Sequence, residues 1–387
     1  MPCLTAYAKL YAEEREILES LENGATMLTL RHARVLEVVR TRPGYIEVNV
    51  EFDGENGRAI CYPALIGEVK PGDEVVINTT AVDVGLGTGG SHFILWNLAR
   101  RSLEAPAPGH IMKLRYTPLQ IKCLAAEERE SPHHEVLRDA SSIDGMPVII
   151  ATLHSQLPAA AVMLRKLMPK AKIAYIMTDG AALPLAFSET VAGLKEGGFI
   201  DTTITIGHAF GGDLEAINIY SGLATAKYAA EADVAIVCMG PGIVGTGTKL
   251  GYTGIEQGQI VNAVNSLGGV AIAVPRLSFA DKRERHLGLS HHTITALKVA
   301  ATTPAIVTFP VVDGEKTSII EGQVLRAEIG HIHRIETLDA SETRAALEAA
   351  AMRPTTMGRG IEEEPEFFMA AGAAAIFAAR ILVGDES

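Results

Sequence analysis

Few cysteines, few aromatic residues and no excess of positive charge characterise this sequence. Its four cysteines, Cys3, Cys61, Cys123 and Cys238, are far apart and form no CxxC pair. Neither a disulfide framework nor a zinc knuckle is therefore indicated. The 34 Lys and Arg residues are outnumbered by 46 Asp and Glu, giving a formal charge of −12 that repels nucleic acid and anionic membranes. We expect a cytoplasmic protein without nucleic-acid or membrane partners.

The sequence also lacks a membrane-spanning run and a secretory leader. The apolar run Phe367–Ala379 has 13 residues, whereas a spanning helix needs about 20, so we expect a buried helix there. Residues 1–25 have no basic leader followed by an apolar core, and their pattern predicts an amphipathic helix. With 387 residues, of which 48% are hydrophobic, the chain is long enough for several domains with sizeable cores.

An α/β fold is predicted, beginning with a small antiparallel β-barrel over residues 26–100. This part is rich in β-branched residues and contains the turn signals Pro43-Gly44 and Asp53-Gly54, which are typical of an OB-like or SH3-like barrel. Residues 101–146 are expected to form a connecting helical segment, in which Thr117 caps a helix that has Pro118 at its first position.

A Rossmann-like α/β domain with a doubly wound, mostly parallel sheet is predicted for residues 147–338, followed by C-terminal helices over 339–387. Short apolar runs alternate there with amphipathic stretches. The expected strands are PVIIATL, KIAYIMT, DTTITIG, DVAIVCM, GVAIAV and AIVTFPVV, with HIHRIETLD as an edge strand. Ser188 and Asp213 are predicted helix caps, and Thr253 with Glu256 reads as a capping box.

The loop after the fourth of these strands is unusually long. Thirteen residues separate Met239 from Thr253, whereas such loops usually span about 2 to 6. Its glycines let the backbone approach an anion, and its other polar residues supply donors. The predicted ligand-binding residues are Gly240, Gly242, Gly245, Thr246, Gly247, Thr248 and Lys249. A purely structural glycine loop remains the alternative, and Gly240, Gly242 and Gly245 also match GxGxxG, a dinucleotide motif.

The next loop is locally basic and adds further candidates. Arg276 at the strand end is suited to pairing with phosphate or carboxylate, and His291 and His292 stand at a helix start. Asp179, His154 and His208 follow other strands and are the acid-base candidates. Because carboxyl ends of parallel strands meet at one edge, we expect one shared site. No metal-ligand spacing such as HExxH is present, so no metal site is predicted.

Several motifs resemble those of a known family. They are NTTAVDVGLGTGG (78–90), GHIMKLRYTPLQ (109–120), LHSQLP (153–158), GPGIVGTGT (240–248) and TMGRG (356–360). In these the chain resembles an uncharacterised bacterial domain-of-unknown-function family, numbered 3866. The resemblance extends over nearly everything after the first 25 residues, but that family has no established activity to transfer.

The function favoured by the sequence is binding of a small anionic metabolite, a nucleotide or phosphorylated compound, with hydrolysis or group transfer as the reaction class. Arg276 and Lys249 would pair with its charge. Two alternatives stay open: an NADP-dependent oxidoreductase, and a noncatalytic assembly or regulatory protein. The sequence identifies no cofactor, and a homo-oligomer is compatible with each alternative.

Overall fold

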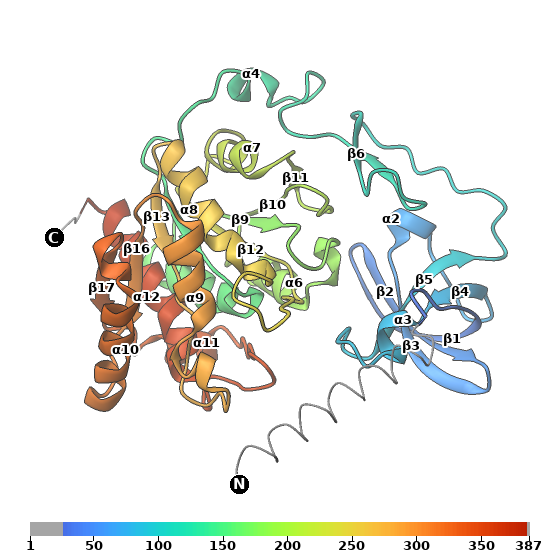
Figure 1. Ribbon diagram of the computed structural model, residues 1–387. Coiled ribbons are helices and arrows are strands. Elements are labelled where there is room, and N and C mark those ends of the chain that lie inside the picture. Colours follow the sequence, from blue (N-terminus) through green and yellow to red (C-terminus); the bar gives the residue numbers. More distant parts are fainter. Residues whose placement is uncertain (1–25, 385–387) are drawn as a thin grey trace, which may run out of the picture. The chain divides into compact units, whose positions relative to one another are not determined.

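The structure of the protein is a computed structural model that describes residues 26–384. The helix predicted over residues 1–25 lies outside the described residues. The chain divides into two compact units between Ala105 and Pro106, which are described separately below (Figure 1).

The first unit is a closed five-stranded barrel with the strand order β1-β2-β3-β5-β4. Its strands are β1 (Leu30–Arg42), β2 (Tyr45–Phe52), β3 (Glu55–Cys61), β4 (Glu74–Asn78) and β5 (Ser91–Asn97). Asp53 and Gly54 both have positive φ, 51° and 81°, as the tight turn between β2 and β3 requires. The predicted barrel is confirmed, with the difference that β3 and β5 pair in parallel.

The beginning of the second unit differs from the predicted helical connection. It contains two short strands, β6 (Ile111–Lys113) and β7 (Ile121–Cys123), and one four-residue helix, α4 (His134–Leu137). The expected helix at Thr117 and Pro118 is wrong. Instead, Thr117 Oγ1 donates to the Leu114 carbonyl at 2.8 Å, within the turn that joins β6 and β7.

An eight-stranded sheet forms the centre of the second unit, and every strand pair in it is parallel. The order β11-β10-β9-β12-β8-β13-β16-β17 includes all six predicted strands and the predicted edge strand. The strands are β8 (Pro147–Ile150), β9 (Ile173–Thr178), β10 (Thr202–Thr205), β11 (Leu214–Glu215), β12 (Val234–Met239), β13 (Val270–Ala273), β16 (Ile306–Pro310) and β17 (Arg334–Leu338).

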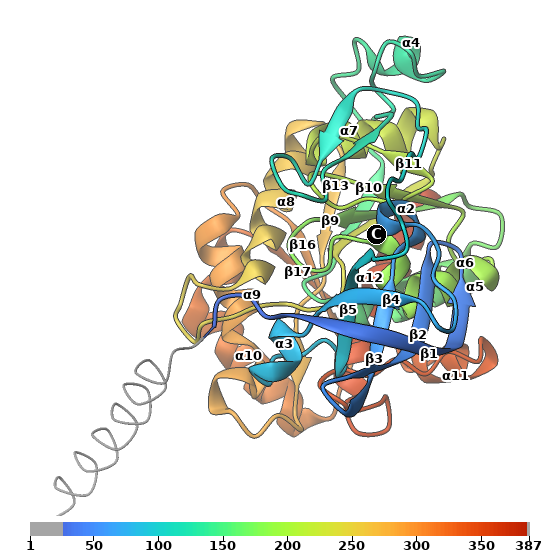
Figure 2. The same ribbon diagram turned by 90° about the vertical axis from the view of Figure 1, so that its right-hand side faces the viewer.

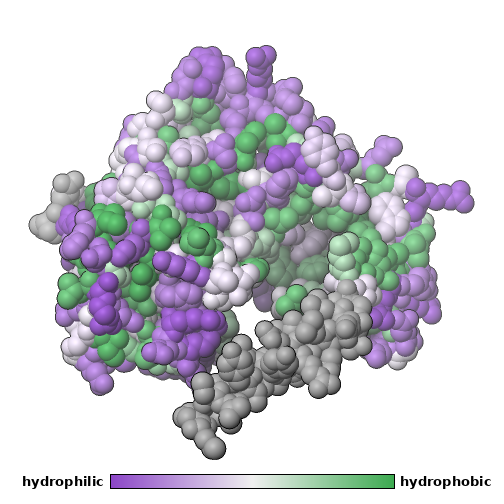
Figure 3. All heavy atoms as spheres, viewed as in Figure 1, coloured by the Kyte–Doolittle hydropathy of each residue, from purple (hydrophilic) through white to green (hydrophobic). Residues whose placement is uncertain are grey.

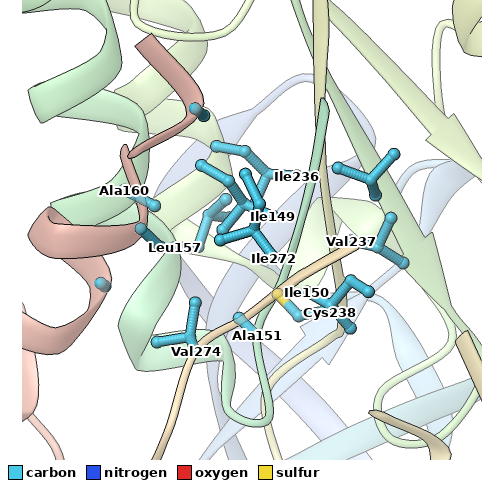
Figure 4. Close-up of a cluster of buried hydrophobic side chains, with 14 of the residues drawn as sticks. Ile149, Ile150, Ala151, Leu157, Ala160, Ile236, Val237, Cys238, Ile272 and Val274 are labelled. Atoms are coloured by element: carbon cyan, nitrogen blue, oxygen red, sulfur yellow. The ribbon is translucent and has the colours of Figure 1, made fainter. Parts of the chain in front are cut away.

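Helices cover both faces of this sheet, as a doubly wound fold requires (Figure 2). One face carries α5 (Leu157–Leu167), α11 (Thr343–Ala349) and α12 (Pro365–Leu382), and the other carries α7 (Ile219–Ala224), α8 (Glu256–Ser266) and α9 (His291–Thr295). Figure 4 shows the core where β8, β12, β13 and α5 meet. Ile149, Ile236 and Ile272 are fully buried there, which accounts for the apolar runs in these strands.

Helix α12 is long and apolar enough to cross a membrane by length and composition, but 67% of its apolar window is buried inside the protein. It packs against α5, β8 and β16, and the predicted buried helix is thereby confirmed. Figure 3 shows hydrophilic and hydrophobic residues side by side on the face that it draws. We therefore interpret α12 as a core helix.

The predicted helix caps had mixed outcomes. Ser188 caps α6 (Glu189–Glu196) by accepting from the Val191 amide, as expected. The Asp213 prediction is wrong: its carboxylate accepts from the Thr203 amide at 2.8 Å and thereby ties β10 to the following segment, while Asn218 caps α7. The capping box is also wrong, because Glu256 accepts from the Thr178 hydroxyl at 2.7 Å.

Close packing between α8 and the turn after α9 generates a prediction. A Cβ on Gly258 of α8 would lie 2.4 Å from the Ala296 carbonyl oxygen and 2.5 Å from the Ala301 nitrogen. Because these are backbone atoms, Gly258→Ala should lower the free energy of unfolding by about 3 kcal/mol. Gly314, at the start of α10 (Gly314–Ala327), has open space around it, so Gly314→Ala is the control and should change stability by less than about 1 kcal/mol. Urea unfolding of both variants measures this, and equal losses would contradict the packing argument.

Candidate functional site

The sheet order opens a crevice at the carboxyl ends of β8 and β12. These strands are neighbours, but the chain leaves β8 through α5 on one face and leaves β12 through α8 on the other (Figure 2). Loops that diverge in this way leave space between them, which is where open α/β sheets bind ligands. The loop after β13, on the other side of β8, borders the same region.

The glycine-rich loop after β12 is a closed hairpin held by its own hydrogen bonds. The Thr246 amide and hydroxyl both donate to the Gly251 carbonyl, at 2.8 and 3.0 Å, and Thr248 Oγ1 accepts from the Gly251 amide at 3.1 Å. A Cβ at Gly251 would lie 2.3 Å from Thr246 Oγ1, so the hairpin needs glycine there. The two threonine hydroxyls predicted as ligand donors are thus engaged within the loop.

The same hairpin departs from the geometry of a dinucleotide fingerprint. That motif places its third glycine where the helix packs against the strand. Here Gly245 pairs with Tyr252 in an antiparallel bridge, and α8 begins only at Glu256. The match of the sequence to GxGxxG therefore has no counterpart in the local fold.

A buried carboxylate organises the arginines after β13. Asp281 is 7% exposed and accepts from Arg283 Nε and Nη2 at 2.9 and 2.7 Å. Arg276 is 5% exposed, and its Nη2 lies 3.6 Å from the same carboxylate. Hydrogen bonds from Arg283 hold the pKa of Asp281 well below its usual range. Burial, and next the charge of Arg283, lower the pKa of Arg276 to about 10, so Arg276 is still a cation at neutral pH.

Residues of the C-terminal segment complete this network. Arg359 Nη2 lies 3.9 Å from Asp281 Oδ2, and Arg359 Nε donates to Glu364 Oε1 at 2.8 Å. Glu364 is fully buried and also accepts from the Ser278 hydroxyl at 2.7 Å. The TMGRG motif is thereby attached to the loop after β13, across about 75 residues of sequence.

Three histidines meet beside these arginines, at the start of α9. The ring centroids of His286 and His291 are 4.9 Å apart, and those of His291 and His292 are 4.3 Å apart. Tyr252 stacks on His292 at 4.0 Å and donates its hydroxyl to the His292 carbonyl at 2.6 Å. Burial lowers the pKa of both His286 and His292 to about 3, with nearby cations adding to the effect. Both rings are therefore neutral at physiological pH.

Together these loops line a cavity of about 190 Å³ that is open to solvent on one side. Its wall combines the three loops after β8, β12 and β13 with one residue of the C-terminal segment. The lining residues are Leu153, Ile243, Val244, Gly245, Gly247, Arg276, Arg283, Arg285, His286, His292 and Met357. Among the described residues that line the cavity, three are arginines and none is acidic, although the whole chain has a net negative charge. The cavity is therefore a local electropositive site, suited to an anion.

His154 lies near the crevice but has a bracing role. Its Nδ1 lies 3.1 Å from the Met239 carbonyl oxygen, and its Nε2 lies 2.7 Å from Ser188 Oγ. Both ring nitrogens are thus engaged, and burial lowers its pKa to about 4. In this arrangement His154 joins the loops after β8 and β12 to α6, and no ring nitrogen is left for proton transfer.

Asp179 and His208 form a separate cluster on the β9 and β10 side of the sheet. Asp179 accepts from the His208 amide at 2.9 Å. His208 Nδ1 accepts from the Leu114 amide at 3.0 Å, and its Nε2 lies 3.1 Å from Arg115 Nη2. These contacts attach the β6–β7 hairpin to the sheet. The structure therefore does not bring Asp179, His208 and the arginine-lined cavity into one site.

The cavity contains only part of the predicted residue set. Gly245, Gly247, Arg276 and His292 line it, and the His291 ring contacts that of His292. The other predicted ligand residues, Gly240, Gly242, Thr246, Thr248 and Lys249, are not among its lining residues. The sequence prediction did not include Arg283, Arg285, His286 and Met357. The dense basic run after Arg276 was a signal for the first three, whereas Met357 belongs to the TMGRG motif, which the sequence did not connect with this loop.

These features define a class of protein: a two-unit α/β protein with a five-stranded barrel and a parallel sheet, whose strand ends hold an arginine- and histidine-lined cavity. Residues 58–375 match the model of a family described as Protein of unknown function (DUF3866). The chain belongs to that family, and the match includes every residue that lines the cavity. A search of curated proteins gave no match. The reaction has to be inferred from the site itself.

Glu256, near the Asp179 loop, generates a pH prediction. Burial raises its pKa to about 7, against the hydrogen bond from Thr178. The folded state then binds a proton more tightly than the unfolded chain, so stability is lost as pH rises from about 4.5 to 7. Glu256→Gln retains an acceptor for Thr178 and removes this penalty. We expect the variant to gain about 2 kcal/mol over the wild type at about pH 8 and little at about pH 4.5. Urea unfolding at both values measures it, and a pH-independent difference would contradict the burial argument.

Proposed function

We propose that this protein binds a small phosphorylated or carboxylated metabolite in the cavity between the loops after β8, β12 and β13. The observation that carries the proposal is the charge of the cavity wall, where three arginines and no acidic residue gather in a chain of net charge −12. The buried carboxylate of Asp281 offsets part of this positive charge, and an anion in the cavity would offset more of it.

The volume of the cavity favours a compact ligand. At about 190 Å³ it is below the range of about 300 to 1,000 Å³ that is usual for drug-sized ligands. A phosphate or carboxylate group with a few attached carbons suits this space, whereas a complete dinucleotide exceeds it. This argues for a small phosphorylated compound and against the NADP alternative. The GxGxxG sequence that suggested NADP also lacks the local geometry of a dinucleotide motif.

Two arginines have complementary roles in this proposal. Arg276 is buried, and its Nη2 is 3.6 Å from Asp281 Oδ2, which is longer than a hydrogen bond. It retains donors for a ligand at the base of the cavity. Arg285 is exposed, and its Nη1 would lie 3.7 Å from a Cβ on Gly247. It would reach the ligand from the rim, beside the glycine hairpin.

Binding has more support here than proton transfer. The pKa of His286 and of His292 is about 3, which makes either ring a weak base at neutral pH. Hydrolysis or group transfer therefore stays the reaction class predicted by the sequence, without an assigned acid or base. An assembly or regulatory role and a homo-oligomer also remain predictions.

Titration with small anions tests this proposal. The full chain should bind inorganic phosphate or glycerol 3-phosphate saturably in calorimetry, and Arg285→Gln should weaken binding by about 10- to 100-fold because a charge-assisted contact is lost. Its melting temperature should be unchanged, since Arg285 is exposed.

Arg344→Gln is the matched control. Arg344 is an exposed arginine of α11 that pairs with Glu348 across one helical turn and does not line the cavity. It should bind the anions like the wild type. Equal loss of affinity in both variants would indicate nonspecific attraction, and the absence of binding to any small anion would refute the proposal.

A further inference from the structure

The three histidines beside the cavity have the composition and spacing of a metal site. His286, His291 and His292 each offer a ring nitrogen, and these atoms all lie within 4.8 Å of one another. Two nitrogens on a tetrahedral zinc ion are about 3.3 Å apart. Small side-chain rotations would close the remaining gap, because all three side chains come from one short stretch around the start of α9.

Two of the ring nitrogens have no hydrogen-bond partner. His291 Nε2 and His292 Nδ1 are both buried and unpaired among the described residues. A buried polar nitrogen without a partner costs free energy, and two such atoms on adjacent histidines of the cluster point to a shared ligand. A divalent cation between neutral imidazoles would satisfy both.

The orientation of the rings is already held by neighbouring groups. His286 Nδ1 is 2.7 Å from Ser290 Oγ, and donation from Nδ1 to this oxygen would leave the lone pair of Nε2 available to a metal. The face-to-face contact of Tyr252 fixes the plane of His292. Supporting contacts of this kind are typical of the groups that orient metal-binding histidines.

We propose that His286, His291 and His292 together bind one divalent transition-metal ion, of the class represented by zinc and cobalt, at the wall of the cavity. Imidazole ligands suit this class of metals. Three protein ligands leave a coordination position open, and because His286 and His292 line the cavity, the proposed anion is the candidate for that position. Coordination of the anion by the metal rests on the proposed function. Binding of the metal by the three imidazoles does not depend on it.

A second cluster of possible metal-binding residues is less suited to hold an ion. His110, Glu128 and Glu130 also lie close enough to hold an ion, but Glu128 already accepts from the His110 amide at 2.9 Å and from the Ala125 amide at 2.6 Å. His110 and Glu130 are exposed. We interpret this cluster as a hydrogen-bonded turn, which makes His110 a suitable control position.

Cobalt titration of the full chain tests the metal site. The protein is freed of metal with a chelator and titrated with Co²⁺ in phosphate-free buffer. The wild type should take up one equivalent and develop the visible absorption of tetrahedral cobalt. His291→Gln and His292→Gln should weaken binding at least about 100-fold, because each removes a ligand, while His110→Gln should bind like the wild type. Unchanged binding in both cluster variants, or loss in His110→Gln, would overturn the proposal.

A measurement on the wild type covers the case in which a variant fails to fold. X-ray absorption of the zinc-loaded protein should show three imidazole nitrogens at about 2.0 to 2.1 Å, and fewer than two would overturn the proposal.

Titration of the metal-free protein with inorganic phosphate separates the metal-site proposal from the proposed function. Phosphate binding without cobalt binding would remove the metal site and leave the proposed function. Cobalt binding without phosphate binding would remove the proposed function and leave the metal site.

Discussion

The neighbouring position of β8 and β12 in the sheet is the constraint on which the candidate site depends. These strands are separated by about 80 residues, yet they pair in parallel with β12 lying between β8 and β9. Their helices leave on opposite faces, so the two loops cannot close over each other. His154 braces this opening through the Met239 carbonyl oxygen and the Ser188 hydroxyl. Without this arrangement the loop after β13 would have no cavity to line.

A second level of organisation comes from the carboxylate of Asp281. One buried acidic group draws Arg283, Arg276 and Arg359 toward it, at 2.7, 3.6 and 3.9 Å. Glu364 also pairs with Arg359, but two carboxylates cannot neutralise these three guanidinium groups together with Arg285, so positive charge remains at the cavity. Asp281 thus stabilises the loop and also concentrates the charge that a bound anion would complement.

The neutral charge of the imidazoles beside the arginines has two consequences. Burial and neighbouring cations keep the His286 and His292 rings uncharged, so they do not add to the repulsion among the arginines. Uncharged rings also retain the lone pairs that metals bind. The anion site and the adjoining metal site that we propose can each be measured independently of the other.

Local patterns in the sequence were sufficient for most strands of the parallel sheet but not for the site. Short apolar runs predicted the strands of the parallel sheet, and loop length and glycine content indicated the hairpin after β12, because burial and backbone freedom are encoded residue by residue. Strand order is not local. It places Asp179 and His208 with Arg115, away from the cavity, and it makes His154 a brace. Only the tertiary structure brought Met357 and Arg359 of the TMGRG motif to the loop after β13, because contacts between residues far apart in the sequence determine where the C-terminal segment lies.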